Sequence, residues 1–316
     1  GVWQQKTRLS PRGGSVQSFG HQVALDGASL AISAIDDASC ATGIDGDETD
    51  TGCTGAGAVF LYALDDTGAW IQSAYVKAAH VRAGDGFGAQ IALDGDRLIV
   101  SAPGTDSCES GLDAELGDSG CEGSGSVHIF DRYQGQWVLD AVLAAPEAQT
   151  RARFGSSLSL SVDLMAVGAV GDAMCEGDGR VIEACTSGGA VHLYRLIQGA
   201  WRHEARLQGL RTERGDRFGQ SVGLGAGSLL VGVPGADGCG RGVNDADNDS
   251  GCPEAGAVEV FRALDGDWVQ VMRVQLPESE EDEVASDHAS FGTLLSVDGD
   301  SVTIAAPGTG SARVFE

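Results

Sequence analysis

The sequence predicts an all-β fold, a five-bladed β-propeller in which each blade has four antiparallel strands. Three observations support this prediction: an internal repeat, four short strands within each repeat, and chain ends that complement each other. The five Trp residues are separated by 67, 67, 64 and 67 positions, at Trp3, Trp70, Trp137, Trp201 and Trp268. Repeats of this length with four strands each are typical of propeller blades.

Two more aromatic positions follow the same period. One is a Phe-Gly pair, at Phe19-Gly20, Phe87-Gly88, Phe154-Gly155, Phe218-Gly219 and Phe291-Gly292. The other is a single aromatic residue, at Tyr62, Phe130, Tyr194, Phe261 and Phe315. With the Trp residues, these positions hold 15 of the 18 aromatic residues, so the aromatic core is expected to repeat from blade to blade.

The strands can be assigned in order within one repeat. After Phe-Gly, residues 22–25 alternate in polarity and end at Asp26-Gly27, a strong hairpin signal that recurs at 94–95 and 298–299. A second apolar run follows, as in 98–102, and a third strand comes after a variable insertion, as in 57–62. The Trp opens the fourth strand, as in 137–143. No longer stretch has helical periodicity.

We expect one domain, residues 1–316. The predicted blades are residues 19–86, 87–153, 154–217, 218–290, and 291–316 together with 1–18. The chain starts with a Trp-bearing fourth strand (3–9) and stops after a third strand (311–315), so we expect the N-terminal strand to join the C-terminal blade and close the ring. Closure would remove an exposed sheet edge. Two β-sandwiches are the alternative, but they explain neither the spacing nor the chain ends.

Composition excludes several classes of function. The chain has 20 basic and 46 acidic residues and a net charge of −26, which makes nucleic acid and anionic membranes poor partners. No apolar run approaches the roughly 18 residues that a membrane-spanning helix needs.

The Phe-Gly pair is followed some residues later by Ala102-Pro103-Gly104, Val233-Pro234-Gly235 or Ala306-Pro307-Gly308. This pattern resembles the FG-GAP repeat, which builds the propeller of integrin α-subunits and of many bacterial surface and secreted proteins. The resemblance covers essentially the whole chain and implies a fold more than a function. Integrin propellers have seven blades and often a calcium loop between strands one and two. Here that hairpin is a tight turn, so we expect that calcium site to be absent.

The eight Cys residues form four local pairs, each within one insertion between strands two and three. We expect disulfides Cys40–Cys53, Cys108–Cys121, Cys175–Cys185 and Cys239–Cys252. Such bridges require an oxidising compartment and predict a secreted, periplasmic or surface-exposed protein. They either rigidify recognition loops or simply staple loops that would otherwise fray.

Strand polarity predicts that these insertions share one face with the connections between blades. Elaboration confined to one face is typical of binding surfaces on a scaffold. The acidic run 278–283 lies on the same face and is interpreted as a solvated loop, with a cation or a partner as the alternative.

Acidic residues at alternate positions in the insertions suggest a calcium site, because Ca²⁺ takes six to eight oxygen ligands. The candidate ligands are Asp45, Asp47, Asp50, Asp113, Glu115, Asp118, Asp245, Asp247 and Asp249. The alternative is an acidic surface that maintains solubility, as in a salty habitat.

No catalytic constellation is predicted, and we expect no enzyme activity. The candidate channel residues of the innermost strands are neutral: His21, Gln22, Gln90, Ser157, Gln220, Ser221 and Thr293. One third-strand position holds Phe60, His128, His192, Glu259 and Arg313, and such variety is interpreted as an exposed strand face. The Trp residues are expected to pack between blades.

Three functions remain open. The first is a non-catalytic extracellular adhesion or protein-recognition module that uses the stapled rim. The second is a calcium-dependent lectin, and the third is a structural component that self-associates. A protein or glycan is therefore the expected ligand.

Overall fold

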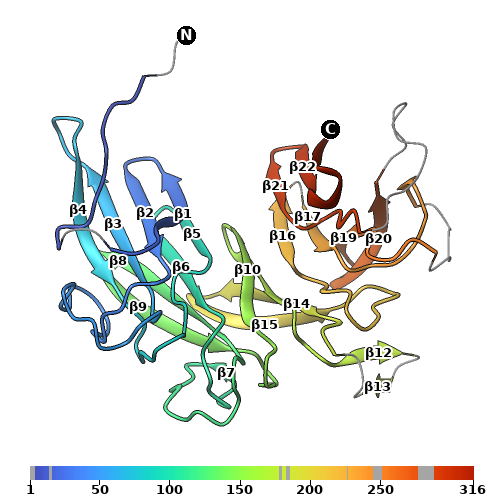
Figure 1. The fold of residues 1–316 in the computed structure, drawn as a ribbon, viewed down its shortest axis with the longest axis horizontal. Helices are drawn as coiled ribbons and strands as arrows, with labels where there is room; N and C mark the ends of the chain where they lie inside the picture. The colour runs from blue at the N-terminus through green and yellow to red at the C-terminus, as the bar shows by residue number, and fades with distance from the viewer. Residues whose placement is uncertain are drawn as a thin grey trace.

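Short antiparallel strands build five successive sheets in the computed structural model, which describes residues 4–13, 16–177, 180–182, 186–225, 227–244, 251–276 and 288–316 (Figure 1). Each of these five sheets is one blade, and its main strands lie side by side in chain order; in blades two and four a short strand from the insertion is added at the outer edge. The five-bladed, all-β propeller predicted from the repeat is therefore confirmed. No helix in the described part of the chain is long and apolar enough to cross a membrane.

The first two blades contain the strands predicted for them. Blade one consists of β1 (Phe19–Asp26), β2 (Ser29–Ala34), β3 (Ala58–Leu64) and β4 (Trp70–Val76). Blade two consists of β5 (Ile91–Asp94), β6 (Arg97–Ala102), β8 (Ser126–Tyr133) and β9 (Gln136–Ala144), with the short β7 (Gly111–Leu112) added at its outer edge.

Blades three and four repeat this order. Blade three consists of β10 (Phe154–Ser161), β11 (Leu164–Ala169), β14 (Ala190–Ile197) and β15 (Ala200–Leu207); its insertion forms the hairpin β12 (Cys175–Gly177) and β13 (Arg180–Ile182). Blade four consists of β16 (Ser221–Gly225), β17 (Ser228–Val233), β19 (Ala257–Leu264) and β20 (Asp267–Gln275), with β18 (Gly242–Val243) at its outer edge.

Among the described residues the fifth blade has three strands, which corrects the prediction that the N-terminal segment supplies a fourth. It contains β21 (Leu295–Asp298), β22 (Ser301–Ala306) and β23 (Ser311–Phe315), with a 3₁₀ turn η1 (Pro307–Thr309). Residues 4–10 form no strand and do not pair with β23. In Figure 1 the five sheets follow an arc, and the first and the fifth lie on opposite sides of its opening. Tight Asp-Gly hairpins do form where predicted, as at Asp26↔Ser29 and Asp94↔Arg97.

Apolar side chains on both faces of each middle strand hold neighbouring blades together. Every residue of β2 and of β17 is buried. The side chains on one face of each strand pack in one buried cluster, and those on the other face pack against the next blade. Two Trp residues pack between blades as predicted: Trp137 is buried in the cluster that joins blades one and two, and Trp201 in the cluster that joins blades two and three. Trp70 packs in a cluster of its own blade. Trp3 lies outside the described residues.

Glycine makes close backbone contact between blades possible. Gly57, just before β3, has a positive φ of 84°, and a Cβ built there would lie 2.1 Å from the carbonyl oxygen of Phe87 in the next blade. Gly125 repeats this contact with Phe154 at 2.2 Å. Only glycine permits this approach, so the Gly before strand three and the Phe-Gly pair of the following blade are two halves of one contact.

Candidate functional site

Three disulfides close the insertions of blades one, two and four, as the sequence predicted. Cys40–Cys53, Cys108–Cys121 and Cys239–Cys252 each join Cα atoms 5.0 Å apart. Cys185, half of the fourth predicted pair with Cys175, lies outside the described residues. We call residues 40–53, 108–121 and 239–252 the first, second and fourth stapled loops. Disulfides of this kind are typical of extracellular proteins.

Each stapled loop also pairs with the fourth strand of its own blade. Ile44 forms a bridge with Val76, β7 pairs with β9, and β18 pairs with β20. In each case the paired residue lies three or four positions after the first Cys. The sequence analysis did not predict these contacts, which seat each loop along the edge of its blade.

The stapled loops and the connections between blades lie on the same face, as strand polarity predicted. The backbone N–H groups of Gly84 and Gly86 donate hydrogen bonds to the carbonyl oxygens of Thr54 and Gly55, each at 3.0 Å. The connection from blade two to blade three repeats this contact, because Arg153 N–H donates to Gly123 at 3.0 Å. The connections are therefore attached to the segments at which stapled loops end.

In the first stapled loop, the predicted calcium ligands accept hydrogen bonds from the protein itself. Asp45 Oδ1 accepts from the Tyr75 backbone N–H at 2.9 Å, and Asp47 Oδ1 accepts from the N–H of Thr49 at 2.8 Å. Asp50 accepts from the N–H groups of Cys40 at 2.8 Å and Gly52 at 3.1 Å. These bonds lower the pKa of Asp47, chiefly through the Thr49 hydroxyl, and the pKa of Asp50, chiefly through Cys40.

The second stapled loop uses its carboxylates in two ways. Asp118 accepts hydrogen bonds from the Ser107 hydroxyl and from the Cys108 N–H, and these bonds lower its pKa. Asp113 and Glu115 are exposed, because the residues that alternate with them, Ala114 and Leu116, are buried against β9. Their carboxylates therefore point outward rather than toward Asp118.

Within the described residues, the acidic side chains of the first two stapled loops do not come together as a group of metal ligands. Among the described residues, no three His, Cys, Asp or Glu side chains form a group that could hold a metal ion. Asp245, Asp247 and Asp249 lie outside those residues, so calcium binding by the fourth stapled loop stays a prediction.

A sequence motif that the sequence analysis missed indicates the role of Asp50 and Asp118 in ordering their loops. Both begin the same four-residue motif, Asp50-Thr51-Gly52-Cys53 and Asp118-Ser119-Gly120-Cys121, and blade four repeats it at 249–252. A Cβ at Gly52 or Gly120 would lie 2.8 Å from the opposing Sγ atom. The motif thus joins a carboxylate that orders the loop to a glycine that leaves room for the disulfide.

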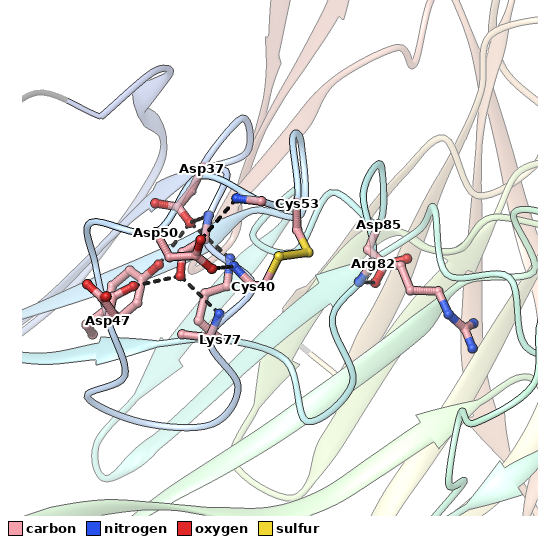
Figure 2. Close-up of a disulfide and its surroundings, with 12 residues drawn as sticks. Asp37, Cys40, Asp47, Asp50, Cys53, Lys77, Arg82 and Asp85 are labelled. Carbon is pink, nitrogen blue, oxygen red and sulfur yellow. Dashed lines mark hydrogen bonds and ion pairs between the residues drawn. A yellow bond between two sulfur atoms is a disulfide. The ribbon is translucent and has the colours of Figure 1, made fainter.

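A buried ion pair lies behind the first stapled loop and was also missed (Figure 2). Lys77 Nζ lies 2.9 Å from Asp37 Oδ1, with the two side chains 0% and 3% exposed. The same oxygen accepts from the Tyr75 hydroxyl at 2.8 Å and from the Ser39 N–H at 3.1 Å. Burial lowers the pKa of Lys77, and Asp37 opposes this shift. The sequence indicates this ion pair by Lys77 itself, because the equivalent positions of the other blades hold Ala144, Gln208 and Gln275.

Blade three builds an equivalent pair from other residues. Asp172, which occupies the position of Asp37, is 2.8 Å from Arg206 on β15 and also accepts from the Met174 N–H at 2.8 Å. In both blades a carboxylate after the second strand ties the start of the insertion to the fourth strand. We call the face that carries the stapled loops and the connections between blades the loop face. We infer that these two ion pairs hold the loops of this face in place.

A cleft of about 490 Å³ lies on the loop face between blades one, two and three. Its walls are the connection segments 83–86 and 151–153, and its remaining lining comes from loops after the second strands and from the end of the second stapled loop. The lining residues are Ile35, Ala83, Gly84, Asp85, Gly86, Pro103, Gly104, Asp106, Glu122, Gly123, Arg151 and Arg153. This volume suits a small ligand group or a few residues of a peptide.

The cleft carries charges of both signs. Asp85 is buried and accepts a hydrogen bond from the Arg82 N–H at 2.7 Å, and burial raises its pKa to about 6. Asp106 accepts from the Gly123 N–H at 2.9 Å. Arg151 is 3.3 Å from Glu122, whereas the exposed guanidinium of Arg153 makes no hydrogen bond or ion pair with any described residue. Arg153 is therefore the cation available to a ligand.

The connection at this cleft is held by a side chain that reaches the second stapled loop. Arg82 donates hydrogen bonds through its guanidinium to the carbonyl oxygens of Gly117 and Asp118. Thr54 and Gly55, which directly follow the first stapled loop, accept hydrogen bonds from the backbone of the same connection. One wall of the cleft is thus attached to two disulfide-bonded loops, which fixes its position.

In blades one to four the third-strand position that was interpreted as an exposed face is buried, so that prediction was wrong there; Arg313 in blade five is half-buried. Phe60 and His128 are 0% exposed, His192 is 3% and Glu259 is 2%. These side chains face the ring of the Phe-Gly pair, as in the edge contacts Phe87–His128 and Phe154–His192 at 5.3 and 5.5 Å. Burial lowers the pKa of both His residues to about 3.

Glu259 is the carboxylate of this set. Its Oε1 is 2.9 Å from Arg273 Nη1, but its buried Oε2 has no hydrogen-bond partner among the described residues. Burial raises its pKa to about 7. The residue type therefore varies at this position because each blade fills the same buried site with a different side chain, and not because the site is exposed.

Comparison with known proteins agrees with this architecture. The sequence model of the FG-GAP repeat matches residues 70–130 and 137–194. Each match begins at the Trp of one fourth strand and ends at the aromatic residue of the third strand in the next blade, so it spans one contact between blades. A search of curated proteins finds no match. The chain is thus a five-bladed β-propeller with FG-GAP repeats over residues 70–130 and 137–194.

Proposed function

We propose that this protein is a non-catalytic extracellular binding module whose ligand is another protein, held on the loop face at the cleft between blades one, two and three. The observation that carries the proposal is the attachment of the cleft walls to the stapled loops. A preformed, rigid cleft lowers the entropic cost of binding. Connections of this kind on a propeller carry binding groups far more often than the strands do.

The charges of the cleft indicate the chemistry of the ligand. Asp85 and Asp106 attract a Lys or Arg side chain, and Arg153 offers donors to a carboxylate or a backbone carbonyl of the same segment. The net charge of −26 adds long-range attraction for a basic partner. The proposed ligand is therefore a protein segment with a basic side chain beside an acceptor group.

Nothing in the cleft resembles an activated nucleophile, and this supports a binding role over catalysis. Its lining contains no Ser, Cys, His or Lys nucleophile, and its acidic groups are Asp85, Asp106 and Glu122. Its carboxylates accept hydrogen bonds from the adjacent loops. We therefore assign Asp85 and Asp106 to ligand recognition.

The test is binding of immobilised peptides by the oxidised chain and two variants. Ala83→Trp fills the cleft from an exposed position, and Ala28→Trp makes the same change in the exposed β1–β2 turn on the opposite face. Basic peptides are expected to bind the wild type and Ala28→Trp but not Ala83→Trp. Binding that survives in Ala83→Trp and is lost in Ala28→Trp would assign the ligand to the other face.

The lectin alternative has a distinct outcome. A glycan array probed in calcium buffer and again with a chelator would give chelator-sensitive binding if the fourth stapled loop holds Ca²⁺. Such a result, with no peptide binding, would replace the proposal of a protein ligand.

A further inference from the structure

A second pocket, of about 430 Å³, lies between β4, the outer strand of blade one, and the β8–β9 hairpin of blade two. We call it the flank pocket. Its lining includes Ile44, Asp45, Ser73, Arg132, Gln136 and Trp137. It shares no lining residue with the cleft on the loop face, so the two are separate features of the molecule.

A β-bulge in the fourth strand brings one extra side chain to this place in each blade. In blade one the register shifts between Leu61 and Tyr62, which leaves Ser73 of β4 without a partner residue on β3. The same shift in blade three leaves Glu204 of β15 without a partner residue on β14. Both residues follow the Trp of their strand by three positions, so Ser73 and Glu204 are equivalent.

Blade three fills the equivalent place with an ion pair. Arg195 Nη2 donates to Glu204 Oε1 at 3.1 Å, and the indole Nε1–H of Trp268 in blade four donates to the same oxygen at 2.7 Å. The Trp of one blade therefore finds its hydrogen-bond acceptor on the bulge of the preceding blade. In blade one the short side chain of Ser73 stands where this carboxylate would be.

Blade two fills this place with a different pair of charged side chains. Arg97 lies 2.7 Å from Asp131, and its guanidinium carbon is 5.3 Å from the centre of the Trp201 ring. The strand pairings put Ser29 and Ala63 of blade one at the positions of Arg97 and Asp131. Blade one thus has small side chains where the next two blades have charged ones, and the flank pocket is the space that remains.

The flank pocket offers hydrogen-bond donors and acceptors that the chain itself does not use. The indole N–H of Trp137, the hydroxyl of Ser73 and the side-chain amide of Gln136 form no hydrogen bond with any described residue. Asp45 accepts from the Tyr75 N–H at 2.9 Å through Oδ1, which leaves its Oδ2 for a ligand. A ligand can therefore satisfy groups of both kinds in one pocket.

The charges at the flank pocket favour a neutral ligand over an anionic one. Arg132, whose guanidinium lies 5.2 Å from the centre of the Trp137 ring, is 2.6 Å from Asp96 and is thus already paired. Asp45 adds an exposed carboxylate, and the whole chain has a net charge of −26. A carboxylate would be repelled here. A neutral hydroxyl can accept from Trp137, and another can donate to Asp45.

We propose that the flank pocket binds one unit of a neutral saccharide without a metal ion. A sugar hydroxyl takes the place that the Glu204 carboxylate has in blade three and accepts from the Trp137 N–H. Other hydroxyls reach the remaining unpartnered polar side chains, and the carbon face of the sugar ring packs on the apolar wall, which includes Ile44 and Ala74. An apolar wall with a few polar groups in a pocket of this volume is typical of a site for a small ligand.

The test is binding of the oxidised chain, in buffer with a chelator, to immobilised neutral oligosaccharides and to oligosaccharides rich in uronic acids. The neutral set is expected to bind. Ser73→Glu puts the blade-three side chain into the flank pocket and gives Trp137 an acceptor from the chain itself, so affinity should fall at least tenfold. Trp137→Phe keeps an aromatic ring in the cluster and removes the N–H, which should weaken binding about tenfold.

Two controls keep a general effect from imitating this result. Val271→Glu makes a matched change at the equivalent bulge of blade four, at an exposed residue outside the flank pocket, and should bind neutral glycans like the wild type. Ala83→Trp fills the cleft on the loop face and should also bind them like the wild type, so the outcome does not depend on the protein ligand proposed above. If Trp137→Phe loses the wild-type circular dichroism spectrum, Ser73→Glu decides.

Four results would overturn the proposal. Neutral-glycan binding that Ser73→Glu leaves unchanged would place the sugar elsewhere on the molecule. Binding to the uronic-acid set alone would mean that the ligand is an anion. Binding that appears only when calcium replaces the chelator would assign it to a metal site. No binding to either set would mean that the flank pocket takes no saccharide.

Discussion

Lys77 Nζ lies 2.9 Å from Asp37 Oδ1, and both side chains are buried beneath the first stapled loop. The pair connects the fourth strand of blade one to the start of its insertion. The loop and the connection at residues 84–86 are bonded to each other, so the pair lies under the elements that form one wall of the proposed cleft.

Removing one member of this pair is expected to be costly. Lys77→Met leaves the Asp37 carboxylate buried without its cation and should lower the free energy of unfolding by about 3 kcal/mol. The double variant Asp37→Asn with Lys77→Met should recover most of this loss, because an amide oxygen still accepts from Tyr75 and Ser39. Urea denaturation of the three chains measures both. Equal stability of the single and double variants would contradict a buried ionic pair.

Glu259 makes stability depend on pH. Its folded pKa of about 7 lies above the ordinary value, so the folded state holds a proton that the unfolded state has lost. Its contribution is therefore complete at acid pH and is lost as pH rises toward 7. Relative to Glu259→Gln, the wild type should lose about 3 kcal/mol of unfolding free energy between pH 4.5 and 8. A difference that does not change with pH would show that Arg273 holds Glu259 ionised.

His128 has the opposite dependence. Burial lowers its pKa to about 3, so the unfolded state binds a proton near pH 5 that the folded state does not, and stability rises with pH up to the ordinary His value. Its Nδ1 is buried and has no hydrogen-bond partner among the described residues, and blade one carries Phe60 at the same position. His128→Phe should stabilise the fold by about 1 kcal/mol at pH 8 and by about 2 kcal/mol more at pH 5. Thermal unfolding at the two pH values is the measurement, and a gain that is equal at both would refute the neutral buried imidazole.

The first disulfide should contribute through its loop. Replacing Cys40 and Cys53 with Ala is expected to lower the unfolding free energy by about 3 kcal/mol for a loop of this size. It should also weaken peptide binding at the cleft, because Thr54 and Gly55 hold the wall at residues 84–86. The matched change at Cys239 and Cys252, in blade four, should cost similar stability and leave peptide binding intact. Equal loss of binding in both variants would mean a global effect.

The repeat in the sequence was sufficient to predict the blades, because Trp70, Trp137 and their equivalents report packing that every blade shares. Three disulfides and the common face of loops and connections also followed from spacing and strand polarity. The predicted pairing of the N-terminal segment with blade five is absent from the structure. The sequence of a strand specifies what the segment can pair with, and not which partner it finds. His128 and Glu259 were misread because a position can vary in residue type while it stays buried, provided that each residue finds its own local solution.

The candidate site was predicted less well for a related reason. Acidic residues at alternate positions have the composition of a calcium loop, and calcium binding stays a prediction; in the structure Asp47 Oδ1 and Asp50 accept hydrogen bonds from backbone N–H groups of the same loop. The Asp-Thr-Gly-Cys motif could have revealed this role. The cleft itself could not be read from sequence, because its lining comes from separate segments of three blades.

The proposed binding face is tested most directly by peptide-array binding of the wild type, Ala83→Trp and Ala28→Trp in one buffer of moderate ionic strength. The account predicts that basic peptides bind the wild type and Ala28→Trp alike, that added salt weakens this binding, and that Ala83→Trp loses at least tenfold in affinity. Full binding by Ala83→Trp, with loss in Ala28→Trp, would contradict a ligand site between the stapled loops.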